Sequence, residues 1–137
     1  MLKTIREYSF EEWKLYMLSV RGAKWIEIDG YKVRIESPRI RLMLSQKPRR
    51  GRVCANCGRL GSKVYLQIET NPCISFPKDK AAFFVYSDDE MMLTCDHVFP
   101  RSKGGKTTGS NLQTLCRECN LFKAATIPVD MFSAFPV

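Results

Sequence analysis

Hydrophobic residues first recur with a helical period shortly after the start of the chain. Four apolar residues lie three or four positions apart: Phe10, Trp13, Met17 and Val20. This spacing is typical of the buried face of an amphipathic helix. Ser9 and Glu12 form the S-x-x-E pattern of a capping box, and Gly22 supplies a stop signal. The pattern predicts a helix that begins after Ser9 and ends before Gly22, with its aromatic residues in the core.

The next stretch alternates with the period of a β-strand. Apolar and polar residues alternate over residues 25–28 and again over residues 31–35. Asp29 and Gly30 stand between the two runs. Because an Asp-Gly pair between alternating runs is a strong signal for a tight turn, we expect a β-hairpin here.

A shorter alternation follows this hairpin. Its members are, in order, Arg39, Ile40, Arg41, Leu42 and Leu44. A strand at this place would turn its apolar residues to the core and both arginines outward together, because side chains alternate across a strand. The pattern therefore predicts a third strand with an arginine-bearing surface.

From residue 53 onward, short apolar runs are separated by turns. Strands are expected in four of them, at residues 63–69, 81–87, 91–97 and 111–116. A helix is expected from Cys116, and the proline-containing tail at 126–137 is expected to pack as an extended strap. The mixture predicts an α+β fold, in which a helix and a β-hairpin form an N-terminal extension.

Length and composition are those of a small globular protein. The chain has 137 residues, of which 45% are apolar and 26% are charged, so one domain with a small extension is expected. No apolar run approaches the roughly 18 residues that a membrane span needs. Charged residues interrupt the N-terminus early, which argues against a secretory signal. We therefore expect a soluble cytoplasmic protein with no membrane partner.

The net charge of +8 is concentrated in one stretch. Residues 32–52 contain a single acid, Glu36, and eight basic residues: Lys32, Arg34, Arg39, Arg41, Lys47, Arg49, Arg50 and Arg52. A concentrated basic segment is typical of a nucleic-acid-binding protein. A solvated strand face followed by a loop would account for the same charges.

Four of the six cysteines form two C-x-x-C pairs, Cys54 with Cys57 and Cys116 with Cys119. Two such pairs supply the four thiolates of a tetrahedral structural zinc site. Two disulfides or a redox pair are the alternatives, disfavoured by the expected compartment and by the presence of two pairs. The sequence thus predicts one structural Zn²⁺, with Cys95 as a small buried apolar residue.

The single histidine lies among other polar residues. His97 follows Asp96 at the end of a predicted strand, and a glycine-rich loop comes next. Asn111 and Asn120 flank the second cysteine pair. One histidine is ordinarily structural, but an aspartate, a histidine and two asparagines in this order suggest a site.

These motifs carry a resemblance to a known family. In order they are C-A-N-C, the Asp-His pair, a Pro-x-Ser-x-Gly-Gly loop, Asn-Leu, C-x-x-C-Asn and a later lysine. Residues 54–123 thereby resemble the HNH endonuclease family. The third motif position, often histidine in that family, is Asn120 here, which makes this an HNN variant. The resemblance implies a ββα-metal (His-Me finger) core stapled by the four-cysteine zinc site.

The resemblance also implies a division of the chain. Residues 51–137 would form the HNH nuclease domain with its C-terminal strap, and residues 1–50 a DNA-docking or scaffold extension. The activity implied is that of a metal-dependent DNA endonuclease. It would nick or cut double-stranded DNA and leave 5′-phosphate and 3′-hydroxyl ends.

The same resemblance implies a role for each site residue. His97 would be the general base, Asp96 and Asn120 would bind one Mg²⁺ or Mn²⁺, and Asn111 would hold the loop and orient His97. The residues expected to contact the substrate are Lys123, Arg39, Arg41, Arg49, Arg50 and Arg52. With one active site per chain, a monomer would nick one strand.

Two other readings share most of these features. A non-catalytic, zinc-stabilised nucleic-acid-binding module would keep the zinc and the basic stretch. A regulatory protein of phage or mobile-element type, in a bacterial or phage-infected cell, would keep a degenerate nuclease fold. The complete set of Asp96, His97, Asn111 and Asn120 favours the nuclease, because a binding module has no need of it.

Overall fold

The computed structural model describes residues 1–44, 51–98, 104–106 and 111–126. Within them the strands are β1 (Leu2–Ser9), β2 (Trp25–Ile28), β3 (Tyr31–Arg34), β4 (Gly61–Glu69), β5 (Lys80–Ser87), β6 (Met92–His97) and β7 (Leu112–Cys116). The helices are α1 (Phe10–Ser19), α2 (Pro38–Met43) and α3 (Arg117–Thr126). The mixed α+β class predicted from the sequence is confirmed. Arg49, Arg50, the tail and most of the glycine-rich loop lie outside the described residues.

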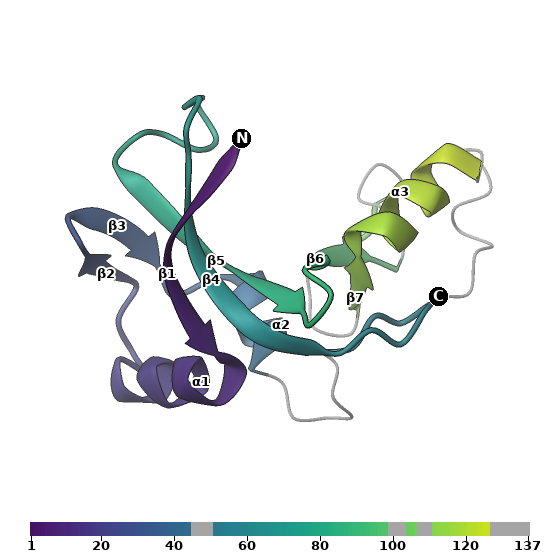
Figure 1. Cartoon of the computed structure of the whole chain (residues 1–137), viewed down its shortest axis with the longest axis horizontal. Coiled ribbons are helices and arrows are strands. Elements are labelled where there is room, and N and C mark those ends of the chain that lie inside the picture. The colour runs from purple at the N-terminus through teal and green to yellow at the C-terminus, as the bar shows by residue number, and fades with distance from the viewer. Residues whose placement is uncertain (45–50, 99–103, 107–110, 127–137) are drawn as a thin grey trace.

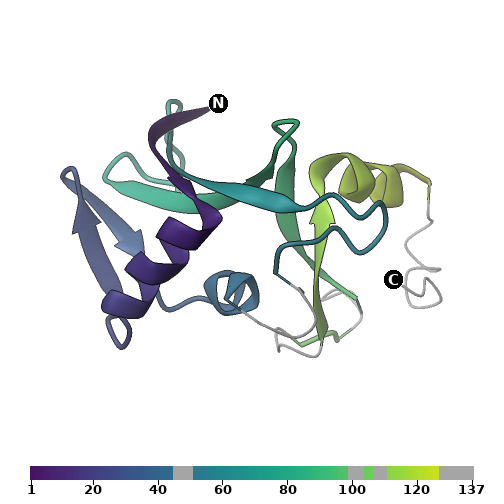
Figure 2. The same ribbon diagram turned by 60° about the horizontal axis from the view of Figure 1, so that its bottom comes forward.

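All the described strands join one sheet (Figure 1). Its main path runs β1-β4-β5-β3-β2, and β6 pairs with β5 and β7. The β1–β4, β4–β5, β5–β6 and β6–β7 pairs are antiparallel, whereas β3 and β5 are parallel. Strands from residues 1–50 are therefore hydrogen-bonded to strands from the second half. In Figure 2, α1 and α2 lie below the sheet, and α3 lies at the end formed by β6 and β7.

The sequence analysis missed β1. Leu2, Ile5 and Tyr8 are its half-buried positions, so its apolar residues recur every three positions rather than every two. The reason is an irregularity in the β1–β4 register between Thr4 and Arg6. A bulge of this kind inserts a residue and breaks the alternation that identifies a strand.

Helix α1 begins as predicted. The Ser9 hydroxyl accepts a hydrogen bond from the Glu12 amide at 3.1 Å, and the Glu12 carboxylate accepts one from the Ser9 amide at 3.0 Å. Trp13 is fully buried against Phe83 of β5, with ring centroids 5.8 Å apart. Phe10 and Met17 are buried beside it, so the predicted apolar face of the helix is the core face.

The predicted β-hairpin is also confirmed. β2 and β3 pair from Trp25 opposite Arg34 to Ile28 opposite Tyr31. Asp29 and Gly30 connect them with φ values of 53° and 85°. Two positive φ angles are the mark of a type I′ turn, whose twist matches that of the paired strands.

The predicted third strand is wrong: this segment is α2. Ser37 accepts a hydrogen bond from the Ile40 amide through its hydroxyl, and a proline occupies the first turn. Serine as N-cap followed by proline is a helix-start signal that outweighs a short alternation. The two arginines consequently do not face outward together. Arg39 is half-buried with its guanidinium 4.4 Å from the Phe84 ring centroid, whereas Arg41 is exposed.

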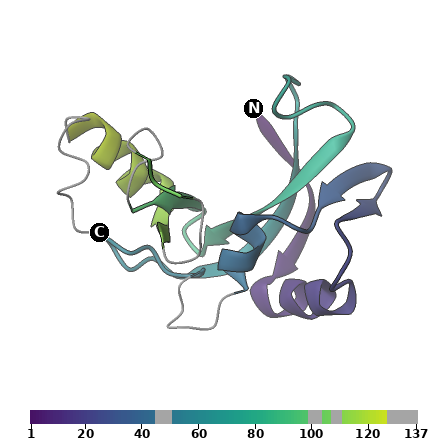
Figure 3. The same cartoon turned by 180° about the vertical axis from the view of Figure 1, so that it is seen from behind.

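The elements of the second half match their predictions. β4 to β7 and α3 form where the apolar runs and the second cysteine pair predict them. Cys95 differs, because it is half-buried rather than buried. Its partial burial raises the pKa of the thiol. Seen from behind, α2 lies between the β2–β3 hairpin and the β6–β7 strands (Figure 3).

Candidate metal centre and active site

The four cysteines of the two C-x-x-C pairs converge. Their sulfur atoms all lie within 4.8 Å of one another, and the Cys57 and Cys116 sulfurs are 3.7 Å apart. Metal–sulfur bonds of about 2.3 Å in a tetrahedron place sulfurs about 3.8 Å apart. The cluster is thus close to the size that a bound ion requires. Cys54 and Cys116 are buried, and Cys57 is exposed.

Each pair forms a tight turn around one sulfur. The Cys57 amide donates to the Cys54 sulfur, and the Cys119 amide donates to the Cys116 sulfur, each at 3.4 Å. The first turn is closed by the Gly58 amide, which donates to the Cys54 carbonyl at 3.0 Å. Gly58 has a φ of 80°, a conformation that glycine adopts without strain. The second pair sits where β7 ends and α3 begins.

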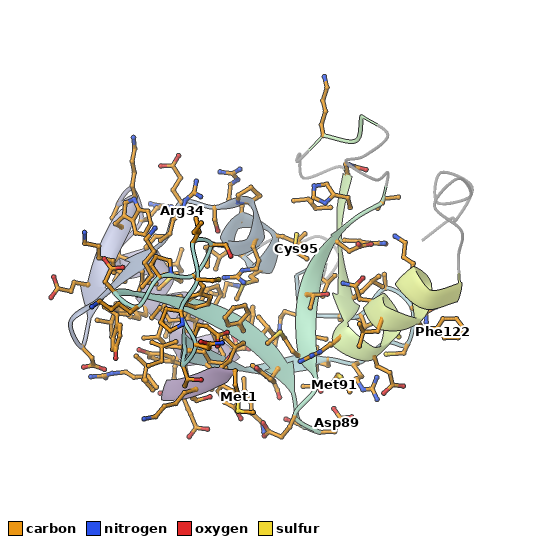
Figure 4. All side chains as sticks on the ribbon, turned by 90° about the horizontal axis from the view of Figure 1, so that it is seen from above. Met1, Arg34, Asp89, Met91, Cys95 and Phe122 are labelled. Atoms are coloured by element: carbon orange, nitrogen blue, oxygen red, sulfur yellow. The ribbon has the colours of Figure 1, made fainter. Side chains whose placement is uncertain are left out.

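Hydrogen-bond donors favour the thiolate of Cys54, whereas burial raises the pKa of Cys119 to about 12. Burial acts to raise the pKa of Cys54, but amide donors from Cys57, Cys116 and Asn56 outweigh it and lower that pKa to about 6. Arg59 donates to the Cys116 sulfur at 3.3 Å and pairs with Asp89 at 3.0 Å. Asp89 lies in the turn between β5 and β6 (Figure 4). Four soft, partly shielded sulfurs are a donor set that can hold one metal ion.

Asp96 is fixed by two partners. Its Oδ2 atom accepts from Lys123 Nζ at 2.8 Å and from Gln113 Nε2 at 3.0 Å. Gln113 faces Asp96 across the β6–β7 pair, and its own Oε1 is buried with no hydrogen-bond partner among the described residues. Within the same part of the chain, Asp96 Oδ1 accepts no hydrogen bond. One carboxylate oxygen is therefore anchored, and the other is left for a ligand.

Asn120 is oriented by Thr94. The Thr94 hydroxyl donates to the Leu115 carbonyl at 2.8 Å, so it accepts the bond that Asn120 Nδ2 makes with it at 3.0 Å. This fixes the amide nitrogen of Asn120 on Thr94 and leaves its oxygen as a possible ligand atom. Thr94 and Asp96 are two positions apart on β6, hence on one face. Asn120 and Lys123 of α3 both reach that face, as their three-residue spacing predicts.

Lys123 is not on an open surface. Only 7% of the residue is exposed, and its ammonium group forms an ion pair with Asp96. The role expected for Lys123 as a phosphate contact stays a prediction. In the structure, Lys123 is instead the ion-pair partner of Asp96, the expected metal ligand.

The remaining expected site residues lie at the ends of the same strands. His97 is the last residue of β6 and faces Leu112 of β7. Asn111 precedes β7 and donates from its side chain to the Lys106 carbonyl at 2.7 Å. Its carbonyl accepts from the Val98 amide at 2.9 Å, just beyond His97. Asn111 therefore ties the loop to the strand ends, while its influence on His97 stays a prediction.

Two residues of this cluster were missed in the sequence. Thr94 orients Asn120, and Gln113 holds Asp96. Sequence spacing could have indicated them. Thr94 lies two residues before Asp96 on the same strand, and Gln113 lies two residues after Asn111. Without the strand pairing, nothing marked Gln113 as a neighbour of Asp96.

Two of the arginines expected to contact DNA make internal contacts. The Arg52 guanidinium donates to Glu11 and to the Gly61 carbonyl, and it lies 4.0 Å from the Phe10 ring centroid. Arg39 covers Phe84, as described above. Among the arginines expected to contact DNA that the structure describes, Arg41 is the one whose side chain is exposed.

Comparison with known proteins agrees with the motif. Residues 87–135 match a family described as HNH endonuclease. No curated protein and no solved structure shows significant similarity to the chain. No helix among the described residues is long and apolar enough to cross a membrane. The matched segment contains Asp96, His97 and Asn120, and it confirms the resemblance to the HNH endonuclease family over this part of the chain. The family's description is that of hydrolases acting on nucleic acids.

Proposed function

We propose that the protein is a metal-dependent DNA endonuclease that hydrolyses phosphodiester bonds to 5′-phosphate and 3′-hydroxyl ends. One observation carries the proposal. A carboxylate anchored through a single oxygen, Asp96, stands next to His97 and faces a helix that presents Asn120, within the HNH segment. We further propose that β6, β7 and α3 are the ββα-metal core of the family.

The cysteine cluster would hold a structural zinc ion. Zinc is the ion that four cysteines in two C-x-x-C pairs most often bind, and it has no redox chemistry of its own. With all four positions taken by sulfur, no position is left for substrate. The cluster would therefore stabilise the start of α3, and with it the placement of Asn120 and Lys123.

A second, harder cation would belong to the oxygen site. Asp96 Oδ1 and the amide oxygen of Asn120 are the donors that Mg²⁺ or Mn²⁺ prefers. When bound there, such an ion would neutralise charge on the scissile phosphate and on the departing oxygen. The anchored Oδ2 keeps the carboxylate in one orientation before any ion or substrate arrives.

His97 would act as the general base. A neutral imidazole can accept a proton from water in this role. The deprotonated water would attack phosphorus and the bond to the 3′ oxygen would break. That oxygen would take up a proton from solvent water, and the phosphate would stay on the 5′ side. Asn111, bound to the Lys106 carbonyl, would hold the loop that follows His97.

Residues 1–50 would serve the nuclease as scaffold and docking surface, with residues 51–137 as the catalytic part. The scaffold role is supported by β1 and β3, which pair with β4 and β5. Docking of double-stranded DNA is supported by the exposed cations of the basic stretch. Among the described arginines of this stretch, Arg41 is the candidate for a DNA contact, whereas the guanidinium of Arg52 already has partners within the protein.

A second candidate function is a non-catalytic, zinc-stabilised nucleic-acid-binding module. The Lys123–Asp96 ion pair favours it, because the pair gives Asp96 a structural role that needs no cation. The two candidates make different claims about His97. A nuclease needs its imidazole, and a binding module does not.

Cleavage of supercoiled plasmid with Mg²⁺ or Mn²⁺ separates the candidates. The full chain is expected to produce nicked or linear DNA, and His97→Ala and an EDTA control are expected to produce none. A loss of about 10² to 10⁴-fold would be typical of a removed general base. The His97→Ala variant should keep its metal content and its affinity for DNA.

Matched asparagines provide the control. Asn120→Ala removes an expected ligand, whereas Asn71→Ala removes an exposed side chain in the β4–β5 loop. Only the first should reduce cleavage. Undiminished cleavage by His97→Ala would reject His97 as the base. The absence of cleavage by folded, metal-loaded protein that still binds DNA would favour the binding module.

A further inference from the structure

An exposed tryptophan stands at the hairpin end of the sheet, away from the proposed active site. Trp25 is 45% exposed, and Lys80 places its ammonium 5.0 Å from the ring centroid. An open hollow of about 540 Å³ lies beside it, lined by Trp25, Ile26, Glu27, Lys32 and Lys80.

The strand register puts these side chains on one face. Trp25 is opposite Arg34 in the hairpin, and Lys32 is in register with Lys80 across the parallel β3–β5 pair. The alternate positions, such as Val33, are buried on the other face, where α1 packs. Figure 4 is seen from above, with α1 on the far side, and it labels Arg34 at the hairpin end, beside α2.

The cations of this face have no acidic partners among the described residues. Lys32, Arg34 and Lys80 form no ion pair within the described residues. Other basic side chains of the structure are neutralised by acids: Arg6, Arg52, Arg59, Lys63 and Lys123. Glu27 is the one carboxylate lining the hollow, so the three cations leave an excess of positive charge.

The same face leads toward the proposed active site. Along β5 it continues through Phe84, which Arg39 covers, to Tyr86. Tyr86 is in register with Met92 of β6, and alternation along β6 then brings the face to Asp96. A strand of nucleic acid lying along this face would meet aromatic and basic side chains before it reaches Asp96.

We infer that this face binds a single-stranded segment of nucleic acid, with a base stacked on Trp25 and phosphates beside Lys32 and Lys80. Stacking requires an unpaired base, and the π-face of every base suits an aromatic ring. A duplex hides its bases and would use the cations alone. The inference rests on the proposed function for the class of partner, and it adds an unpaired segment to the substrate.

The test is binding of a fluorescein-labelled oligothymidylate to the full chain, followed by anisotropy without divalent metal so that nothing is cleaved. Trp25→Ala is expected to weaken binding about tenfold, and Trp25→Phe to weaken it less. Lys32→Gln with Lys80→Gln should lower the slope of log affinity against log salt by about 1.4, or about 0.7 for each phosphate contact. The α1 control removes the same charge, through Lys14→Gln in the helix and Arg21→Gln just after its end, and should leave the slope unchanged.

A second readout does not depend on affinity. The chain has two tryptophans, and Trp13 is fully buried. Stacking on Trp25 should therefore quench part of the emission of the natural protein, and this quenching should disappear in Trp25→Phe. Thermal unfolding establishes that each variant is folded.

Several outcomes would overturn the inference. They are unchanged affinity in Trp25→Ala, an equal loss in the α1 control, or equal affinity for a duplex of the same length. Plasmid nicking combined with any of these would leave the proposed function standing. Binding that depends on Trp25, without nicking, would sustain the inference and count against the nuclease.

Discussion

The two ends of the sheet are stabilised by different means. At the α1 end, Trp13, Phe83 and Leu66 are fully buried and pack as a conventional core. At the α3 end, the helix contacts β6 through Asn120 and Lys123, while its apolar residues Leu121 and Phe122 are 60% and 63% exposed. Among its described side chains, which extend to Lys123, helix α3 thus contacts the strands through polar groups and the cysteine cluster.

This difference has a chemical consequence. A helix that presents polar side chains to the strands it covers, as α3 does, gains little hydrophobic stabilisation from them. A metal bound by four thiolates can supply the missing stability at one end of the helix. The α1 end has no such demand and relies on aromatic packing.

The largest expected effect is removal of the cysteine site. Cys119→Ser should abolish metal binding and expose β6, β7 and α3 to rapid hydrogen exchange, because structural zinc sites contribute on the order of 10 kcal/mol. The amides of β1, β4 and β5 should stay protected. Metal content and hydrogen exchange measure both effects. Cys73→Ser, which changes an exposed cysteine outside the cluster, is the control, and an equal loss of protection throughout the sheet would contradict the comparison.

A cavity at the other end should act on the whole fold. Trp13→Ala is expected to cost about 3–5 kcal/mol of unfolding free energy, because it removes the largest fully buried side chain. Urea denaturation of the metal-loaded protein, followed by circular dichroism, measures it. Trp25→Ala removes an exposed tryptophan and should cost less than about 1 kcal/mol. Similar costs for the two variants would mean that the α1 end is not held by its core.

The ion pair at the α3 end should have an intermediate effect. Asp96→Asn leaves the ammonium of Lys123, with 8% of its side chain exposed, beside a neutral amide. The expected cost is about 2 kcal/mol, the value of a hydrogen bond to a charged partner. Adding Lys123→Met should recover most of it. Thermal unfolding at fixed metal concentration measures the effect, and unchanged stability in Asp96→Asn would show that the pair does not hold α3.

The smallest expected effect is at the capping box. Ser9→Ala should cost about 1 kcal/mol. The hydrogen bond from the Ser9 amide lowers the pKa of Glu12 below its ordinary value of 4.5. The stabilisation from this carboxylate is therefore present above pH 4.5 and is lost as pH falls through the lowered folded-state pKa. Urea denaturation across this pH range should show a weaker acid dependence in Glu12→Gln, and an unchanged dependence would contradict the assignment.

Local signals predicted the elements that depend on few neighbours. The capping box fixed the start of α1, Asp29-Gly30 fixed the hairpin, and the cysteine pairs predicted the metal cluster. Each works through residues only a few positions apart, or through a chemistry that tolerates long intervening loops. The segment from Pro38 to Met43 failed because its alternation was short and Ser37 competed as a helix cap.

The sequence by itself determined the α+β class, the four cysteines that could hold a metal ion and the presence of an HNH motif around Asp96 and His97. Tertiary structure decided which partner each polar side chain took. The pairing of β6 with β7 brings Gln113 to Asp96, and the packing of α3 brings Lys123 to the same oxygen. These partners lie 17 and 27 residues from Asp96 along the chain. The local pattern of apolar and polar residues therefore cannot predict them. Only the sheet register and the placement of the helix bring them together.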